Sequence, residues 1–120
     1  MTTLELFLGK AGDRVTLKTQ PDNNISSYVV FVQQWLPDGG KKPIATWFPN
    51  ELESAAGASF DLTANSQGYD MILKAQVTND ATIQAEVDFN GTSSFSKGVA
   101  LPKVEGPVVA CEWSIVMVTV

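Results

Sequence analysis

Apolar and polar residues alternate along most of the chain, with the period of two that is typical of strands burying one face. Turn-forming Gly, Pro, Asn and Asp separate most of these segments, and no long helical repeat lies between them. We therefore predict a single all-β domain over residues 1–120, an antiparallel β-sandwich of about eight to nine strands, with jelly-roll and immunoglobulin-like arrangements as alternatives. The alternating segments are 3–8, 15–19, 26–36, 43–48, 58–64, 70–78, 81–89, 93–101 and 110–120.

One short helix is predicted near residues 50–57. Asn50 can cap it, Glu51 and Glu53 suit the positive end of its dipole, and Gly57 can close it. At most this one helix is expected in the chain.

Turn chemistry predicts which strands form hairpins. A loop from Pro37 to Gly39 sets Leu36 opposite Gly40, and counting back then sets Val32 opposite Ile44. This hairpin matches apolar residues on both of its faces.

Two later hairpins are less regular. A loop over 78–80 pairs Met71 with Val87 and keeps the apolar residues of both strands on one face. For the last hairpin, Asn90-Gly91 favours a tight type I′ turn, but the tight register sets Phe95 opposite Glu86. One more loop residue restores Phe95 to Val87, and a bulge near Gly98 is one way to reconcile the two signals.

Two segments are apolar on both faces. In the last strand Cys111, Trp113, Ile115 and Met117 alternate with Glu112, Ser114, Val116, Val118 and Val120, and residues 28–36 behave alike through Val29 and Phe31. Leaving such side chains in water forfeits about 1.5–3 kcal/mol each. A loop or the helix, a second copy of the chain, or a ligand groove would cover them, and we expect a homo-oligomer.

Composition excludes several classes of partner and site. The chain has 120 residues, 44% hydrophobic, and a net charge of −5, which disfavours nucleic acid and anionic lipid. The start "MTTLELFLGK" has no basic leader and no stretch approaches a membrane span, so we expect a cytoplasmic protein or leaderless secretion, and no transmembrane segment.

Catalytic chemistry is poorly represented. The chain contains no histidine, which removes the Ser–His–Asp and Cys–His arrangements, and the single cysteine, Cys111, is expected in the core. In the predicted register Asp70 lies opposite Asp88, and a Ca²⁺ ion could offset their repulsion; otherwise both face water at frayed strand ends. We expect no cofactor other than this calcium ion and no enzyme, with a two-carboxylate hydrolase as a remote alternative.

Two loops and one tryptophan supply candidate binding groups. Amide and carboxylate side chains suit sugar hydroxyls but are also ordinary turn residues, and Trp35 near the first hairpin tip can stack on a sugar or simply lie under Lys41. The size, acidity and loop composition are generally similar to those of small soluble lectins and of membrane-binding β-sandwich proteins. We therefore expect a non-enzymatic carbohydrate-binding module, with a membrane-interacting, toxin-like sandwich that binds lipid headgroups, or a structural assembly subunit, as alternatives. The candidate ligand-binding residues are Trp35, Asp22, Asn23, Asn24, Asn65, Gln67 and Tyr69.

Overall fold

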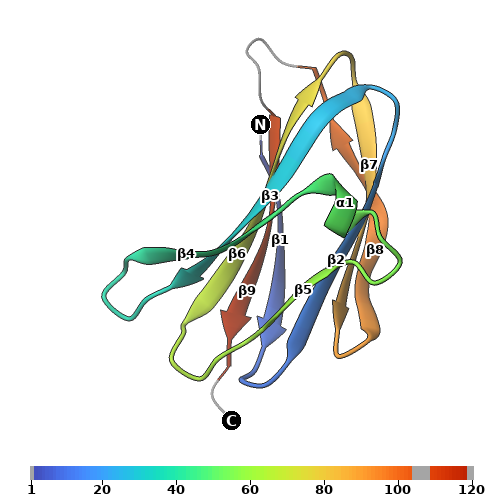
Figure 1. Cartoon of the computed structure of the whole chain (residues 1–120). Coiled ribbons are helices and arrows are strands. Elements are labelled where there is room, and N and C mark those ends of the chain that lie inside the picture. The colour runs from blue at the N-terminus through green and yellow to red at the C-terminus, as the bar shows by residue number, and fades with distance from the viewer. Residues whose placement is uncertain (1, 104–108, 119–120) are drawn as a thin grey trace.

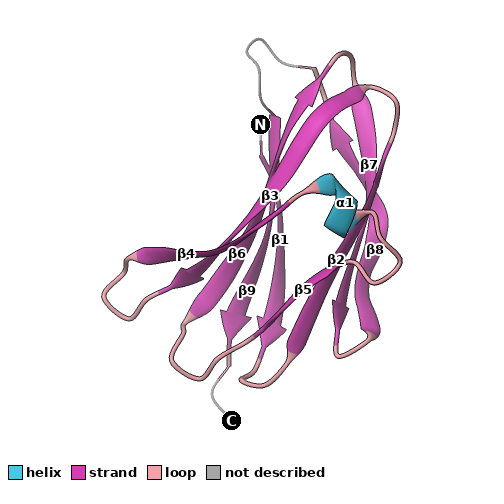
Figure 2. Cartoon of the chain, viewed as in Figure 1, coloured by secondary structure: helices cyan, strands magenta, loops and turns pink. Residues whose placement is uncertain are grey.

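Nine strands form two sheets in the computed structural model, which describes residues 2–103 and 109–118. The first sheet has the order β1-β9-β6-β3-β4 and the second β5-β2-β7-β8, and the two pack as a sandwich (Figure 1). The predicted all-β sandwich with one short helix is confirmed (Figure 2). The strands are β1 (Thr2–Gly9), β2 (Arg14–Pro21), β3 (Ile25–Trp35), β4 (Lys41–Trp47), β5 (Ala58–Asp61), β6 (Gly68–Val77), β7 (Ala81–Phe89), β8 (Thr92–Leu101) and β9 (Val109–Met117).

The helix α1 (Pro49–Leu52) is shorter than the predicted segment. Pro49 occupies its first turn, where the missing N–H costs nothing, and Phe48 rather than Asn50 is its cap residue. Leu52 is fully buried, so the helix is held to the sandwich by one apolar anchor beside β2. Gly57 takes a positive φ of 71° just before β5, in accord with its expected closing role.

The core lies between the sheets and uses one face of each strand. On β9 the buried hydrophobic residues are Cys111, Trp113 and Ile115, as the alternation predicts. On β1 it is Phe7 that turns inward, where its ring meets the rings of Phe89 and Phe95 at 5.9 and 6.1 Å. Leu6 and Leu8 therefore point to the other side of β1, into solvent.

The β3–β4 hairpin begins in the predicted register and then departs from it. The Leu36 N–H donates to the Gly40 carbonyl, and Trp35 pairs with Lys41. A bulge after Val32 shifts the pairing, so Val32 lies opposite Ala45 instead of Ile44. The shift follows Pro43, which has no N–H to donate to a regular ladder.

The predicted hairpin between residues 71–77 and 81–87 is wrong. Strand β6 pairs with β3 and β9 in the first sheet, whereas β7 pairs with β2 and β8 in the second. Residues 78–80 therefore cross between the sheets, and Asp70 does not face Asp88. The alternating pattern requires only that each strand bury one apolar face. A crossover between two packed sheets meets this requirement as well as a hairpin within one sheet does.

The β7–β8 hairpin satisfies both signals seen in its sequence. Asn90 and Gly91 have φ of 55° and 85°, as a tight type I′ turn requires, and Phe89 pairs with Thr92. A register shift after Val87 then brings Phe95 opposite Val87. The bulge lies beside the turn, not near Gly98.

Strands β3 and β9 correspond to the two segments that are apolar on both faces, and their second apolar face lies on the outer side of the first sheet. Strand β9 lies between β1 and β6, inside the sheet. Phe31 is nevertheless 39% exposed and Val118 42%, while Val29 and Val116 are only partly buried. No element among the described residues seals this face, so the expected second copy remains a prediction.

Candidate functional site

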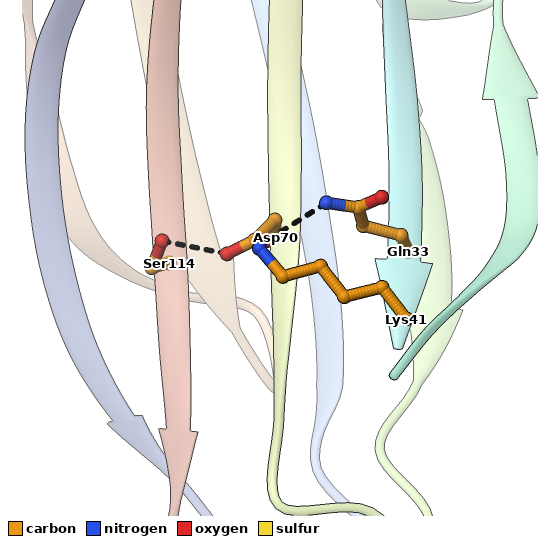
Figure 3. Close-up of polar contacts among 4 residues, drawn as sticks. All are labelled: Gln33, Lys41, Asp70 and Ser114. Atoms are coloured by element: carbon orange, nitrogen blue, oxygen red, sulfur yellow. Dashed lines mark hydrogen bonds and ion pairs between the residues drawn. The ribbon is translucent and has the colours of Figure 1, made fainter. Parts of the chain in front are cut away.

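A buried carboxylate lies on the outer face of the first sheet. Asp70 is 1% exposed, and its Oδ1 accepts a hydrogen bond of 2.8 Å from the Ser114 hydroxyl. Its Oδ2 accepts from the Gln33 amide at 2.9 Å and from the Lys41 ammonium at 3.0 Å. Figure 3 shows these donors reaching Asp70 from strands on both of its sides. We call Asp70, Gln33, Lys41 and Ser114 the Asp70 cluster.

Asp70 and Glu112 share this face and have opposite pKa shifts. Burial alone would raise the pKa of Asp70, but the N–H of Trp35 and the donors Gln33, Lys41 and Ser114 outweigh it and lower the pKa. Burial and the nearby Asp70 carboxylate raise the pKa of Glu112, and Lys41 only partly offsets them. Asp70 therefore loses its proton at a lower pH than Glu112 does.

Trp35 packs against β6, the strand that carries Asp70. A Cβ at Gly68 would overlap the Trp35 ring, so only glycine allows the ring to approach this backbone. The Lys41 Nζ lies 5.9 Å from the ring centroid. The buried indole N–H is close enough to the Asp70 carboxylate to lower the pKa of that group, but its geometry falls short of a hydrogen bond to any described residue. The Trp35 ring therefore contacts the backbone at Gly68, and the Lys41 side chain lies close to the same ring.

A groove of about 750 Å³ lies near this cluster, at one end of the sandwich. The β1–β2 loop, the β5–β6 loop and the end of β9 meet there (Figure 1). The groove is linked to Trp35, because the Gln67 N–H donates to the Trp35 carbonyl at 3.2 Å. Its lining residues are Lys10, Ala11, Ala64, Ser66, Gln67, Met117 and Val118.

The candidate loop at residues 22–24 lies at the opposite end of β3 and β6 from Trp35, beside Thr78. Asp22 accepts hydrogen bonds from the Asn24 N–H at 2.8 Å and the Thr82 N–H at 2.7 Å. The Asn24 amide donates to the Asp80 carbonyl, while Asn23 is exposed. The carboxylate of this loop thus holds the turn together, and the loop does not join Trp35 in one site.

The candidates of the β5–β6 loop divide by exposure. Gln67 lines the groove, and Asn65 is exposed in the same loop. Tyr69 is buried, and its hydroxyl accepts a hydrogen bond of 2.8 Å from the Thr63 N–H and one of 2.7 Å from the Ser66 hydroxyl. Tyr69 therefore anchors the loop through its hydroxyl group, and Gln67 is the candidate among these three that lines the groove.

The two candidate metal ligands lie in different sheets. Asp88, on β7, is buried, and its Oδ2 lies 3.9 Å from the Lys18 Nζ while its Oδ1 has no hydrogen-bond partner within the described part of the chain. Across residues 2–103 and 109–118, no group of three or more metal-binding side chains gathers. The calcium site expected from Asp70 facing Asp88 thus loses its geometric basis.

Sequence reasoning missed most of the Asp70 cluster. Gln33, Lys41 and Ser114 come from β3, β4 and β9. Strands β3 and β9 flank β6 and β4 lies beyond β3, an arrangement set by the long-range sheet order. Local alternation puts Asp70 and Ser114 on one face of their strands, but it cannot say that these strands are neighbours. Cys111 is buried, and burial raises the pKa of its thiol to about 12, as its expected core position implies.

Comparisons with known proteins return no match among family descriptions, curated proteins or solved structures. In the part of the chain that the structure describes, no helix has the length and apolar character needed to span a bilayer.

Proposed function

We propose that this protein is a non-enzymatic recognition module that binds carbohydrate in the groove at the end of the sandwich. The observation that carries the proposal is the groove itself, whose volume of about 750 Å³ falls in the range of small-molecule sites. It also contains Gln67, which the sequence singles out as a sugar-binding amide.

The lining of the groove combines the two chemistries that a sugar presents. Gln67 and Lys10 supply hydrogen-bond donors and an amide acceptor for hydroxyl groups. Met117 and Val118 supply apolar surface for the C–H faces of a sugar ring. Gln67 is exposed, so its side-chain amide is accessible to a ligand.

The Asp70 cluster supports a binding role more than a catalytic one. Both oxygens of Asp70 already accept hydrogen bonds, and the side chain is buried. A catalytic carboxylate must reach the reacting atoms of a substrate. Asp70 instead holds β3, β4 and β9 beside β6, and so steadies the strand that carries Gly68 next to Gln67 and the groove.

Binding to a glycan array, with and without Ca²⁺, tests the proposal. The protein should bind selected glycans saturably, and Gln67→Ala should weaken the affinity for them about tenfold. Gln76→Ala is the matched control, because Gln76 is exposed near the far end of β6, the strand that follows Gln67, and it does not line the groove. Equal affinities for the two variants, or no binding to any glycan, would remove the proposal.

A second candidate function is supported by a separate observation. Leu6 is 62% exposed and Leu8 72%, both on β1, which suits an assembly subunit more than an isolated binding protein. Light scattering tests assembly. Co-sedimentation with liposomes tests the membrane-binding alternative, since apolar side chains at a bilayer interface would also account for the exposure.

A further inference from the structure

We infer that β1 pairs edge to edge with β1 of a second copy, antiparallel about a two-fold axis near Leu6, so that two five-stranded sheets become continuous. This interface is separate from the groove proposed to bind carbohydrate. The inference begins from the four strands that end the two sheets, β1, β4, β5 and β8.

Three of these edges carry features that discourage a further strand. Strand β4 has Lys41, Lys42 and Pro43 in sequence and a register shift against β3. Strand β8 carries Lys97 and Gly98 and has a register shift against β7, while β5 has only four residues. Lysine, proline, bulges and shortness are the usual means by which edges avoid pairing.

Strand β1 has none of these features. It runs for eight residues without Lys or Pro, and its register with β9 is unbroken from Thr2 to Gly9. Within residues 2–103 and 109–118, its only neighbouring strand is β9, so one side of its backbone is unpaired. An unguarded, regular edge of this length is a template for another strand.

The side chains of β1 suit a second copy of the same strand. A two-fold axis near Leu6 sets Leu6 opposite Leu6 of the partner subunit and keeps the exposed leucines of both copies on one face. Val116 lies beside Leu8 on β9, so the new apolar band continues onto the neighbouring strand.

Charge also favours this edge. The chain carries a net charge of −5, so two copies should meet where acidic groups are fewest. The one charged residue of β1, Glu5, is already paired with Lys97 at 3.1 Å. In the Leu6 register it lies opposite Phe7 of the partner strand, so the two Glu5 side chains do not face each other.

Light scattering and sedimentation from about 1 μM to about 1 mM test the inference. The parent should be a dimer at the upper end, and Leu6→Lys should be a folded monomer throughout, because two ammonium groups would meet at the axis. The matched control is Phe31→Lys, which places the same charge on the same exposed face but in the interior of the sheet. It should leave the dimer intact.

Each other outcome overturns the inference. A parent that stays monomeric at all concentrations, or a dimer that survives Leu6→Lys, contradicts the edge contact. Loss of the dimer in Phe31→Lys as well would move the contact to the face of the sheet. Circular dichroism reports folding, and Leu8→Lys, at the most exposed leucine, replaces Leu6→Lys if that variant fails to fold. Glycan binding by the monomeric variant is read separately, since neither leucine lines the groove.

Discussion

Asp70 shows how one buried charge is tolerated on a sheet face. A carboxylate out of water is costly unless donors replace its hydration, and here the hydroxyl, amide and ammonium groups of the Asp70 cluster do so. The Lys41 side chain is about half exposed whereas that of Asp70 is buried, so water reaches the ion pair from the lysine side. The carboxylate thus joins four neighbouring strands through side chains.

Asp70→Asn should destabilise the protein by about 1–3 kcal/mol, because the new amide cannot accept from every present donor and leaves buried groups unsatisfied. Urea denaturation at neutral pH measures the loss. Asp61→Asn is the control, since Asp61 is exposed and faces Arg14 at 3.6 Å, and it should cost under about 1 kcal/mol. Equal losses would mean that the Asp70 cluster contributes little.

The pH dependence of the same variant has a defined sign. The pKa of folded Asp70 is lowered, so its contribution is present above its unfolded pKa of about 3.9 and is lost as the pH falls through the folded value. The difference in unfolding free energy between the parent and Asp70→Asn should therefore shrink in acid. A difference that is constant from neutral to acid pH would contradict the assignment of the charge to Asp70.

Glu112→Gln should have the opposite effect at neutral pH. The pKa of Glu112 is raised by burial and by Asp70, so its ionised form opposes folding once the pH exceeds the folded value. Removing that charge should raise the melting temperature near pH 8, and the gain should vanish below the unfolded pKa of about 4.3. A lower melting temperature at pH 8 would show that the ionised form is stabilised instead.

At the scale of the element, β6 holds the site together through its first residue. Gly68 begins the strand, and Trp35 and the Ile115 carbonyl leave no room for a side chain there. The glycine thus lets the Trp35 ring approach the backbone of β6 closely. Close approach of this kind is a property of the packed structure and not of the turn sequence around it.

Gly68→Ala should cost about 1–3 kcal/mol, because the new methyl group would overlap the Trp35 ring and a backbone oxygen. Urea denaturation followed by tryptophan fluorescence measures both the stability and the environment of the ring. Gly40→Ala is the matched control, since only the flexible Asp38 side chain and Leu36 lie near its new atom, and it should be near neutral. Similar stabilities for both variants would contradict the packing described here.

The strands also show how far sequence reasoning reaches. Local signals predicted the Pro37–Gly39 loop, the Asn90-Gly91 turn and the buried alternation of β9, because each depends on residues close in sequence. The partners of β6 were missed, because β3 and β9 are distant in sequence and a crossover buries the same residues as a hairpin. The Asp70 cluster could not be predicted for the same reason, because its residues come together only when β9, β6, β3 and β4 lie side by side.

At the scale of the whole molecule, the two sheets differ in what their outer faces present. The outer side of the second sheet carries Lys18, Gln84 and Glu86 around a small open pocket. The first sheet instead exposes Leu6, Leu8, Phe31 and Val118, and the carboxylate oxygens of its buried Asp70 accept hydrogen bonds from within the sheet. Such a face can lose water at little cost in unpaired polar groups, which suits an interface.

We propose above all that a second copy of the chain closes the open edge of the first sheet at β1. Amide hydrogen exchange over residues 2–9, measured at two concentrations about a hundredfold apart, tests it most directly. We predict that alternate β1 amides, those directed away from β9, exchange more slowly at the higher concentration, while β4 and β8 are unchanged. Exchange in β1 that is the same at both concentrations, in a protein shown to be folded, would contradict the claim.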